Sequence, residues 1–171
     1  MVAVLTDAGA NMEPGRTAID AASDELGWRT VNDNVMGGRS RGGFAFESGV
    51  LVFRGSTNTD GGGFSSIRST HQPLDLAGAE GMALRVLGDG RTYTMRLETA
   101  DRIAYWASFP TSGGEDFETV HIPFNRFAPR RRGQRLSGPP LKPAAVVGLG
   151  LMIYDGLDGP FQLQVDRIEV H

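Results

Sequence analysis

The chain carries the sequence WRTVNDNVMGGRS at residues 28–40, a dense mixture of one large aromatic residue, amides, a carboxylate and paired glycines. The pattern is too irregular for a helix or a strand. Short polar side chains such as Asn32 and Asp33 bond to nearby backbone, and glycines allow a positive φ. We therefore expect a fixed loop that either seals one end of a domain or recognises a ligand. As a recognition loop it would use Trp28, Asn32, Asp33, Met36, Gly37, Gly38 and Ser40.

The same stretch makes three geometric predictions. Trp28 is expected to be largely buried and to anchor the start of the loop. Asn32 and Asp33 are expected to bond to backbone groups, because their side chains compete with regular secondary structure for those partners. Either Gly37 or Gly38 is expected to take a positive φ.

Beyond the loop the pattern is β. Alternating or apolar runs are separated by Gly, Asp, Asn and Pro, and the Gly88-Asp89-Gly90 turn between two alternating runs is typical of a hairpin. Eight or nine short strands at this spacing predict an all-β, two-sheet jelly-roll sandwich. The expected strands are Val50–Arg54, Gly63–Ser69, Met82–Leu87, Thr92–Glu98, Ile103–Phe109, Phe117–Ile122, Val146–Tyr154 and Phe161–Val170.

One short helix is expected before the loop, since Thr17 and Asp20 resemble a capping box and Gly27 would end the helix. Residues 1–27 would then be an N-terminal extension packed on a sandwich domain at residues 28–171. The segment 125–145 is the longest connection without a predicted strand. It carries a basic run that either belongs to a solvated loop or binds an acidic partner, comprising Arg130, Arg131, Arg132 and Arg135.

Composition narrows the class of protein. A chain of 171 residues is most simply one domain. It contains no cysteine, which excludes disulfides, thiolate catalysis and cysteine-based zinc sites, and its net charge of -3 argues against a nucleic-acid binder. No apolar run is long enough for a membrane span, and the first ten residues do not resemble a signal peptide, so we predict a cytoplasmic protein.

Several motifs then resemble a known family. The stretch from Trp28 to Ser40, together with GGFSSIR at 62–68, GDGRTY at 88–93, VHIPF at 120–124 and GPF at 159–161, is similar to the signature of the complex I intermediate-associated protein family. The resemblance runs from about Trp28 to the end of the chain. It implies a galactose-binding-like β-sandwich and, for the mitochondrial members, a role as an assembly factor for respiratory complex I.

Strand alternation also predicts a polar face, because residues two apart point to the same side of a sheet. If neighbouring strands align, one sheet presents an arginine-rich surface with one tryptophan, which suits a sugar, a carboxylate or a peptide. The alternative is an ordinary solvated face on which Arg96 pairs with Glu98. The predicted face comprises Arg68, Arg85, Arg96, Glu98, Trp106 and His121.

Catalysis has little support in the sequence. The three histidines lie in separate elements, and the chain has neither a nucleophile motif nor a phosphate-binding loop. We expect no catalytic residues and no cofactor, and we keep structural calcium near Asp155 and Asp158 as a hypothesis.

These observations favour a non-catalytic, chaperone-like protein with a polypeptide partner. The first alternative is a carbohydrate-binding module in which Trp106 stacks on a sugar ring, and the second is an unrecognised hydrolase. A sugar module would leave Trp106 exposed beside polar groups, whereas a protein-binding module would show an apolar patch or a loop-made surface. A hydrolase would need a carboxylate or histidine with a shifted pKa in a cleft.

Overall fold

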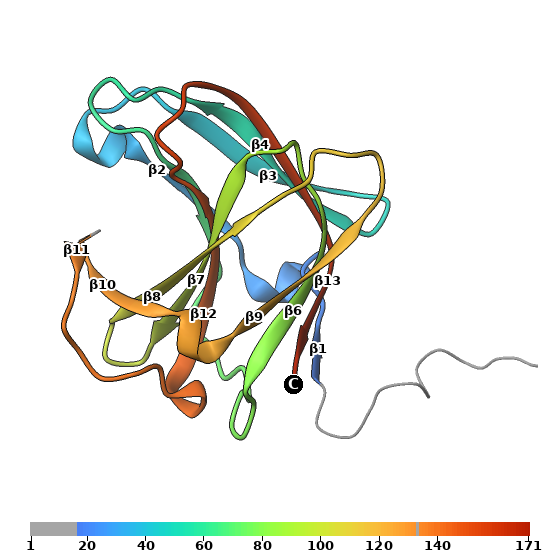
Figure 1. The fold of residues 1–171 in the computed structure, drawn as a ribbon, viewed down its shortest axis with the longest axis vertical. Helices are drawn as coiled ribbons and strands as arrows, with labels where there is room; N and C mark the ends of the chain where they lie inside the picture. The colour runs from blue at the N-terminus through green and yellow to red at the C-terminus, as the bar shows by residue number, and fades with distance from the viewer. Residues whose placement is uncertain (1–16, 133) are drawn as a thin grey trace, which may run out of the picture.

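Two antiparallel sheets make up the fold in the computed structural model, which describes residues 17–132 and 134–171. The sheets face each other and curl. The short 3₁₀ turn η4 (Asp33–Met36) stands on the same side of the molecule as the hairpin of β10 (Ala128–Arg131) and β11 (Gln134–Arg135) (Figure 1). The six-stranded sheet contains β1 (Thr17–Ile19), β3 (Arg41–Glu47), β4 (Val50–Thr57), β6 (Gly81–Leu87), β9 (Glu118–Pro123) and β13 (Gly159–Val170). The seven-stranded sheet contains β2 (Arg29–Asn32), β5 (Ser65–Arg68), β7 (Thr92–Thr99), β8 (Ala104–Pro110), β10 (Ala128–Arg131), β11 (Gln134–Arg135) and β12 (Val146–Ile153).

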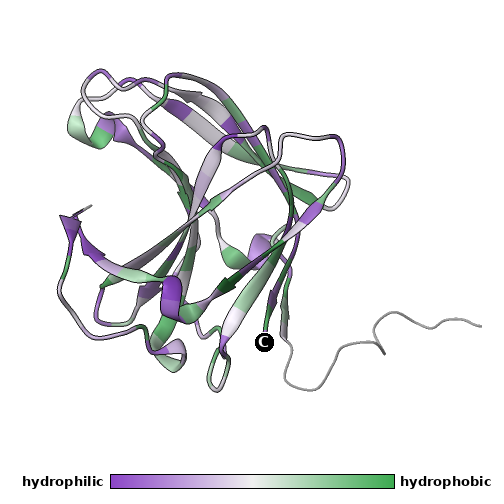
Figure 2. Ribbon diagram, viewed as in Figure 1, coloured by the Kyte–Doolittle hydropathy of each residue, from purple (hydrophilic) through white to green (hydrophobic). Residues whose placement is uncertain are grey.

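The core lies between the two sheets and is built around aromatic side chains. Phe53 and Phe161 come from neighbouring strands of one sheet, with ring centroids 4.9 Å apart, and Tyr93 and Phe109 come from neighbouring strands of the other, at 6.3 Å. Each such side chain removes ~150–250 Å² from water when buried. Hydrophobic residues accordingly run along the strands, whereas the β10–β11 hairpin is hydrophilic (Figure 2). This burial is the main force that holds the sheets together.

The all-β prediction is confirmed, and each of the eight expected strands is found within two or three residues of its predicted bounds. The sheets are antiparallel throughout the described residues. The jelly-roll connectivity stays a prediction. Strands that the sequence reading missed are short or lie at sheet edges, where alternation is too brief to register. They are β1, β2, β3, β10 and β11, and two of them lie in the segment 125–145 that was expected to have no strand.

The expected N-terminal helix is wrong. Residues 17–19 instead form β1, which pairs with β13, and only a single 3₁₀ turn, η3 (Asp24–Leu26), follows before Gly27. Pairing with a long strand outweighs the weak helical preference of so short a segment. Part of the expected extension is therefore a strand of the sandwich itself, while its first sixteen residues lie outside the described range.

The hairpin expected at Asp89-Gly90 is also wrong, because β6 and β7 belong to different sheets. The connection crosses from one sheet to the other. Asp89 bonds this connection to both sheets, because its carboxylate accepts hydrogen bonds from the Tyr93 hydroxyl in β7 (3.0 Å) and from the Gln162 backbone N–H in β13 (2.8 Å). A turn signal thus marks a change of direction without specifying which strands pair.

Arg91 stabilises this crossover. Its guanidinium donates two hydrogen bonds to the carboxylate of Asp155, at 2.9 and 2.6 Å. It also donates to three backbone carbonyls, those of Leu157, Gly159 and Pro160, at 2.8, 2.9 and 3.1 Å. Hydrogen bonding to Asp155 raises the pKa of Arg91. One side chain therefore joins the β6–β7 connection to the loop between β12 and β13.

Replacing Arg91 by lysine should lower the free energy of unfolding by about 2–4 kcal/mol, because an ammonium cannot reproduce the planar fork and leaves partly buried acceptors unpaired. Urea unfolding measures this difference. Arg54→Lys is the control, since Arg54 pairs with Glu47 at 3.0 Å on an exposed surface, and it should change stability by less than ~0.5 kcal/mol. Equal losses in both variants would contradict the role of Arg91.

Candidate binding groove

A buried carboxylate holds the loop of residues 33–40 in place. Asp33 is fully buried (0% exposed), and its carboxylate accepts backbone N–H groups from Ser40 at 2.9 Å, Gly63 at 2.7 Å and Phe64 at 3.3 Å. Burial alone would raise the pKa of Asp33, but these bonds and the Ser40 side chain outweigh it, so the pKa is lowered. The carboxylate thereby links the loop to the start of β5.

Two glycines leave room for this carboxyl group. A Cβ atom at Gly38 would lie 2.6 Å from Asp33 Oδ1, and one at Gly62 would lie 2.6 Å from Asp33 Cβ. Gly38 is therefore required by space. Gly37 takes a φ of 83° at the end of η4 (Asp33–Met36), which confirms the predicted positive φ at one of the two glycines.

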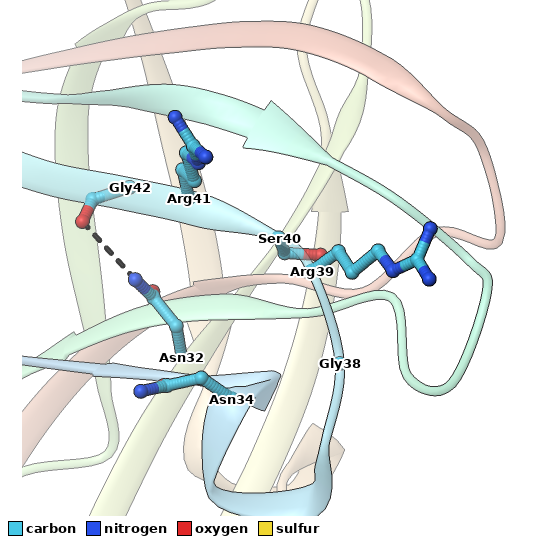
Figure 3. A pocket seen from close by; sticks show the side chains of 7 residues that line it. All are labelled: Asn32, Asn34, Gly38, Arg39, Ser40, Arg41 and Gly42. Carbon is cyan, nitrogen blue, oxygen red and sulfur yellow. Dashed lines mark hydrogen bonds between the residues drawn. The ribbon is translucent and has the colours of Figure 1, made fainter.

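The start of the loop is anchored as expected. Trp28 is 8% exposed, and its indole N–H donates to the Ala21 carbonyl at 2.8 Å. The Asn32 amide donates to the Gly42 carbonyl at 3.2 Å, as Figure 3 shows, and its oxygen accepts the Ser65 hydroxyl at 2.6 Å. The predicted backbone bonding of Asn32 and Asp33 is confirmed. Trp28 itself is an anchor in the core.

One pocket lies on the polar side of the loop. It has a volume of about 480 Å³ and is lined by Asn32, Asn34, Gly38, Arg39, Ser40, Arg41 and Gly42. Its two arginine side chains extend away from Asn34 (Figure 3), and Arg39 makes a wide ion pair of 3.6 Å with the exposed Asp60. Few polar side chains therefore point into this pocket together, as a ligand site would require.

A second pocket lies on the other side of the loop, over the seven-stranded sheet, and we call it the aromatic groove. Its volume is about 560 Å³, within the range of ligand sites. The η4 turn contributes two strongly exposed apolar side chains, Val35 (70%) and Met36 (67%), and the ribbon of the turn is green over part of its length in Figure 2. The lining residues are Val35, Met36, Phe64, Arg68, Trp106, Arg132, Met152 and Tyr154.

Aromatic rings run along this groove. Tyr154, which is 54% exposed, packs edge-to-face against Trp106 at 6.3 Å and against Phe64 at 6.2 Å. The guanidinium carbon of Arg130 lies 5.0 Å from the centre of the Trp106 ring. Such contacts hold the rings in fixed orientations. The Trp106 ring is consequently half-buried and partly covered by its neighbours.

Polar residues of the predicted face border the groove. Arg96 faces Trp106 across one strand pair and Gly150 across the next, and Gly150 in turn faces Arg68. Arg96 forms an ion pair with Glu98 at 3.0 Å, as the solvated-face alternative predicted, and Glu98 also contacts His71 at 3.1 Å. Arg68 and Trp106 reach the groove itself, whereas Arg96 and Glu98 lie beside it.

The prediction of a single face is wrong for Arg85 and His121, which lie in the six-stranded sheet. Arg85 forms an ion pair with Asp166 and lies 4.8 Å over the Phe117 ring. The His121 ring stacks edge-on near His171 at 6.1 Å. Alternation correctly predicted that both side chains point outward. They point outward from the six-stranded sheet, however, and the predicted face lies on the seven-stranded sheet.

Five groove residues were absent from the predicted loop and face, namely Val35, Phe64, Arg132, Met152 and Tyr154, although Arg132 belongs to the basic run that the sequence offered as a contact for an acidic partner. A signal did exist for two of them. Alternation along 146–154 places Met152 and Tyr154 on the side opposite Leu151 and Ile153. The near-continuous apolar run hides this alternation, because it reads as a strand buried on both faces.

A carboxylate that was proposed to bind calcium, Asp155, is already paired with Arg91. Both carboxylate oxygens of Asp155 accept hydrogen bonds from Arg91, and Asp158 accepts the Thr59 N–H at 2.7 Å. Within residues 17–132 and 134–171, no cluster of three or more acidic, histidine or cysteine residues is arranged to hold a metal ion. A calcium ion here would have to displace the guanidinium, so structural calcium stays a prediction.

Comparison with known proteins places the chain in context. Residues 17–165 match the family described as complex I intermediate-associated protein 30 (CIA30). The mitochondrial complex I intermediate-associated protein 30 of Drosophila melanogaster is 25% identical over 186 residues, covering 91% of this chain and 63% of the relative. The chain thus spans less than two thirds of that relative's length.

Solved structures share the fold. A family 11 carbohydrate-binding module from Clostridium thermocellum, in complex with a β-1,3-1,4-mixed-linked tetrasaccharide, superposes with a TM-score of 0.64 at 16% identity, covering 91% of this chain and 94% of the module. A family 29 module complexed with cellulohexaose gives a TM-score of 0.54 at 8% identity over 91% and 89% of the two chains. At these identities the likeness concerns the fold.

Asp33→Asn should lower the free energy of unfolding by about 2–4 kcal/mol at neutral pH, because the amide turns an NH₂ group toward backbone N–H donors. The lowered pKa means that the carboxylate's contribution is complete above its unfolded value of 3.8. It is lost as the pH falls through the folded value. Chemical unfolding across the acid range should therefore show a weaker pH dependence in the variant. Asp60→Asn, at an exposed position, should behave like the parent.

The two tryptophans should respond differently to truncation. Trp28→Ala should cost ~3–5 kcal/mol, as for a core aromatic residue. Trp106→Ala should cost about 1–2 kcal/mol, because its ring is only half-buried. Thermal unfolding of both variants tests the assignment, and a larger loss at Trp106 would make that residue part of the core.

Proposed function

Since the chain belongs to the complex I intermediate-associated protein 30 family, we propose that it is a non-catalytic binding protein of the assembly-factor type that holds a polypeptide segment in the aromatic groove. The observation that carries this proposal is the exposed apolar side of η4. Val35 and Met36 extend into water beside Tyr154. Exposed apolar surface beside a cavity is typical of protein-interaction sites.

The groove fits a polypeptide better than a sugar. A sugar platform needs an open ring face next to hydrogen-bonding side chains, but Trp106 is half-covered by Arg130 and Tyr154. Met36 and Val35 offer no hydrogen bonds to hydroxyl groups, whereas they suit aliphatic side chains. A carbohydrate-binding module remains the second candidate, because the fold is shared with such modules.

A hydrolase is the third candidate. The groove is lined by apolar residues and arginines, and its described lining includes neither a carboxylate nor a histidine that would serve as a general acid or base. The proposal therefore assigns binding rather than catalysis to this surface.

The proposal includes a cytoplasmic location. No helix within the described residues is long and apolar enough to cross a membrane, and the Drosophila relative is described as mitochondrial. An assembly role for a respiratory complex, with protein subunits as partners, is part of the proposal rather than a property carried over from that relative.

Site-specific crosslinking tests the proposal. A photoreactive benzoylphenylalanine at Met36 should crosslink to polypeptides in the source cell, and Trp106→Ala in the same chain should remove those products. The matched control carries the probe at Phe46, an exposed aromatic on the opposite sheet, and should give no groove-dependent product. Titration with a β-1,3-1,4-linked tetrasaccharide completes the test. Saccharide binding that depends on Trp106, without polypeptide crosslinks, would favour the carbohydrate-binding alternative.

A further inference from the structure

Arg68 is a cation of the groove for which no ion pair is found among the described residues. Its neighbour Arg96 is neutralised by Glu98, and the second oxygen of Glu98 is engaged by His71. The Nε atom of Arg68 is buried and has no hydrogen-bond partner in the described part of the chain. A buried donor without a partner is costly. Arg68 also lines the groove, so a ligand oxygen would bind the part of the guanidinium that is open to the groove.

Arg68 also keeps its charge in this setting. Burial and the nearby positive charge of Arg96 lower the pKa of Arg68 to about 10, which is still well above neutral pH. The guanidinium is therefore a partly desolvated cation that faces the groove, and such a group binds a carboxylate more strongly than a fully hydrated one.

The charge of the groove contrasts with that of the whole chain. The chain carries a net charge of -3, yet the charged residues of the described groove lining are Arg68 and Arg132. Arg130 adds a third guanidinium above the Trp106 ring. A local positive potential of this kind attracts and orients an anionic partner.

We infer that the aromatic groove selects an acidic polypeptide segment, in which an aspartate or glutamate carboxylate binds Arg68 while adjacent aliphatic or aromatic side chains pack between Met36 and Tyr154. The inference rests on the proposed function, since it specifies the partner chemistry of the same groove. Arg68 pairs with Gly150, four residues before Tyr154 in the chain, which corresponds to about 13 Å along a strand. An extended segment of roughly four to five residues spans that distance.

Peptide selection provides the test. A random heptapeptide library displayed on phage is selected on the parent protein and, in parallel, on Trp106→Ala, so that peptides lost with Trp106 are those that use the groove. These peptides should be enriched in aspartate or glutamate next to apolar residues. Synthetic versions with blocked ends are then titrated against the parent and against Arg68→Gln.

Replacing the acidic residue of a selected peptide by its amide should weaken binding to the parent by about tenfold or more. Arg68→Gln should weaken binding of the acidic peptide similarly and should abolish the preference for acid over amide. Arg167→Gln, at an exposed arginine of the six-stranded sheet, is the matched control and should bind like the parent. Arg68→Lys provides a second variant if the glutamine variant melts far below the parent, and it should retain part of the preference.

The outcomes separate the two proposals. Groove-dependent peptides without acidic enrichment, or an acid preference that persists in both Arg68 variants, would overturn this inference while the proposed polypeptide binding stands. A selection that yields no peptide dependent on Trp106 would overturn both.

Discussion

The buried carboxylate of Asp33 is the interaction on which the groove depends. A lone ionised group in the protein interior is costly, and here three backbone N–H groups compensate for the lost hydration. Those donors come from the far end of the loop and from the segment before β5, so the bonds form only when both are in place. The close approach of Gly38 and Gly62 to the carboxyl group adds a steric requirement. Together they fix η4, and with it the apolar side chains that overhang the seven-stranded sheet.

The part of the seven-stranded sheet beside the groove combines a small residue with charged side chains. Gly150 leaves space over β12, into which the Arg96 side chain leans, since a Cβ atom at Gly150 would lie 3.2 Å from Arg96 Cβ. Arg96 then reaches Glu98, and the two charges largely cancel. Arg68 lies across the same glycine without a carboxylate of its own. The chemistry of the groove thus follows from the positive charges of Arg68 and Arg132 beside a row of aromatic rings.

The fold resembles that of carbohydrate-binding modules, whereas the side chains of the groove suggest a polypeptide ligand. Carbohydrate-binding modules share the sandwich at 16% identity or less, and a shared scaffold supports many unrelated ligands. In this chain the ring of Trp106 is flanked by Arg130 and Tyr154, and the η4 turn contributes Val35 and Met36 to the groove lining. We propose that these side chains select an apolar and acidic polypeptide, because Val35 and Met36 provide exposed apolar contact area and the arginines provide positive charge.

Local pattern determined much of this protein. Alternation located eight strands, short polar residues and glycines identified the loop at residues 28–40, and outward-facing positions included Arg68 and Trp106. Only the tertiary structure decided which strands share a sheet. For this reason β6 and β7 lie in different sheets, and Arg85 and His121 are not part of the predicted face. It also decided that Asp33 bonds to Gly63, thirty residues away, and that Phe64 and Tyr154 meet Trp106. The physical reason is that side-chain direction follows from the local backbone, whereas strand pairing and buried hydrogen bonds depend on which distant segments offer complementary surfaces.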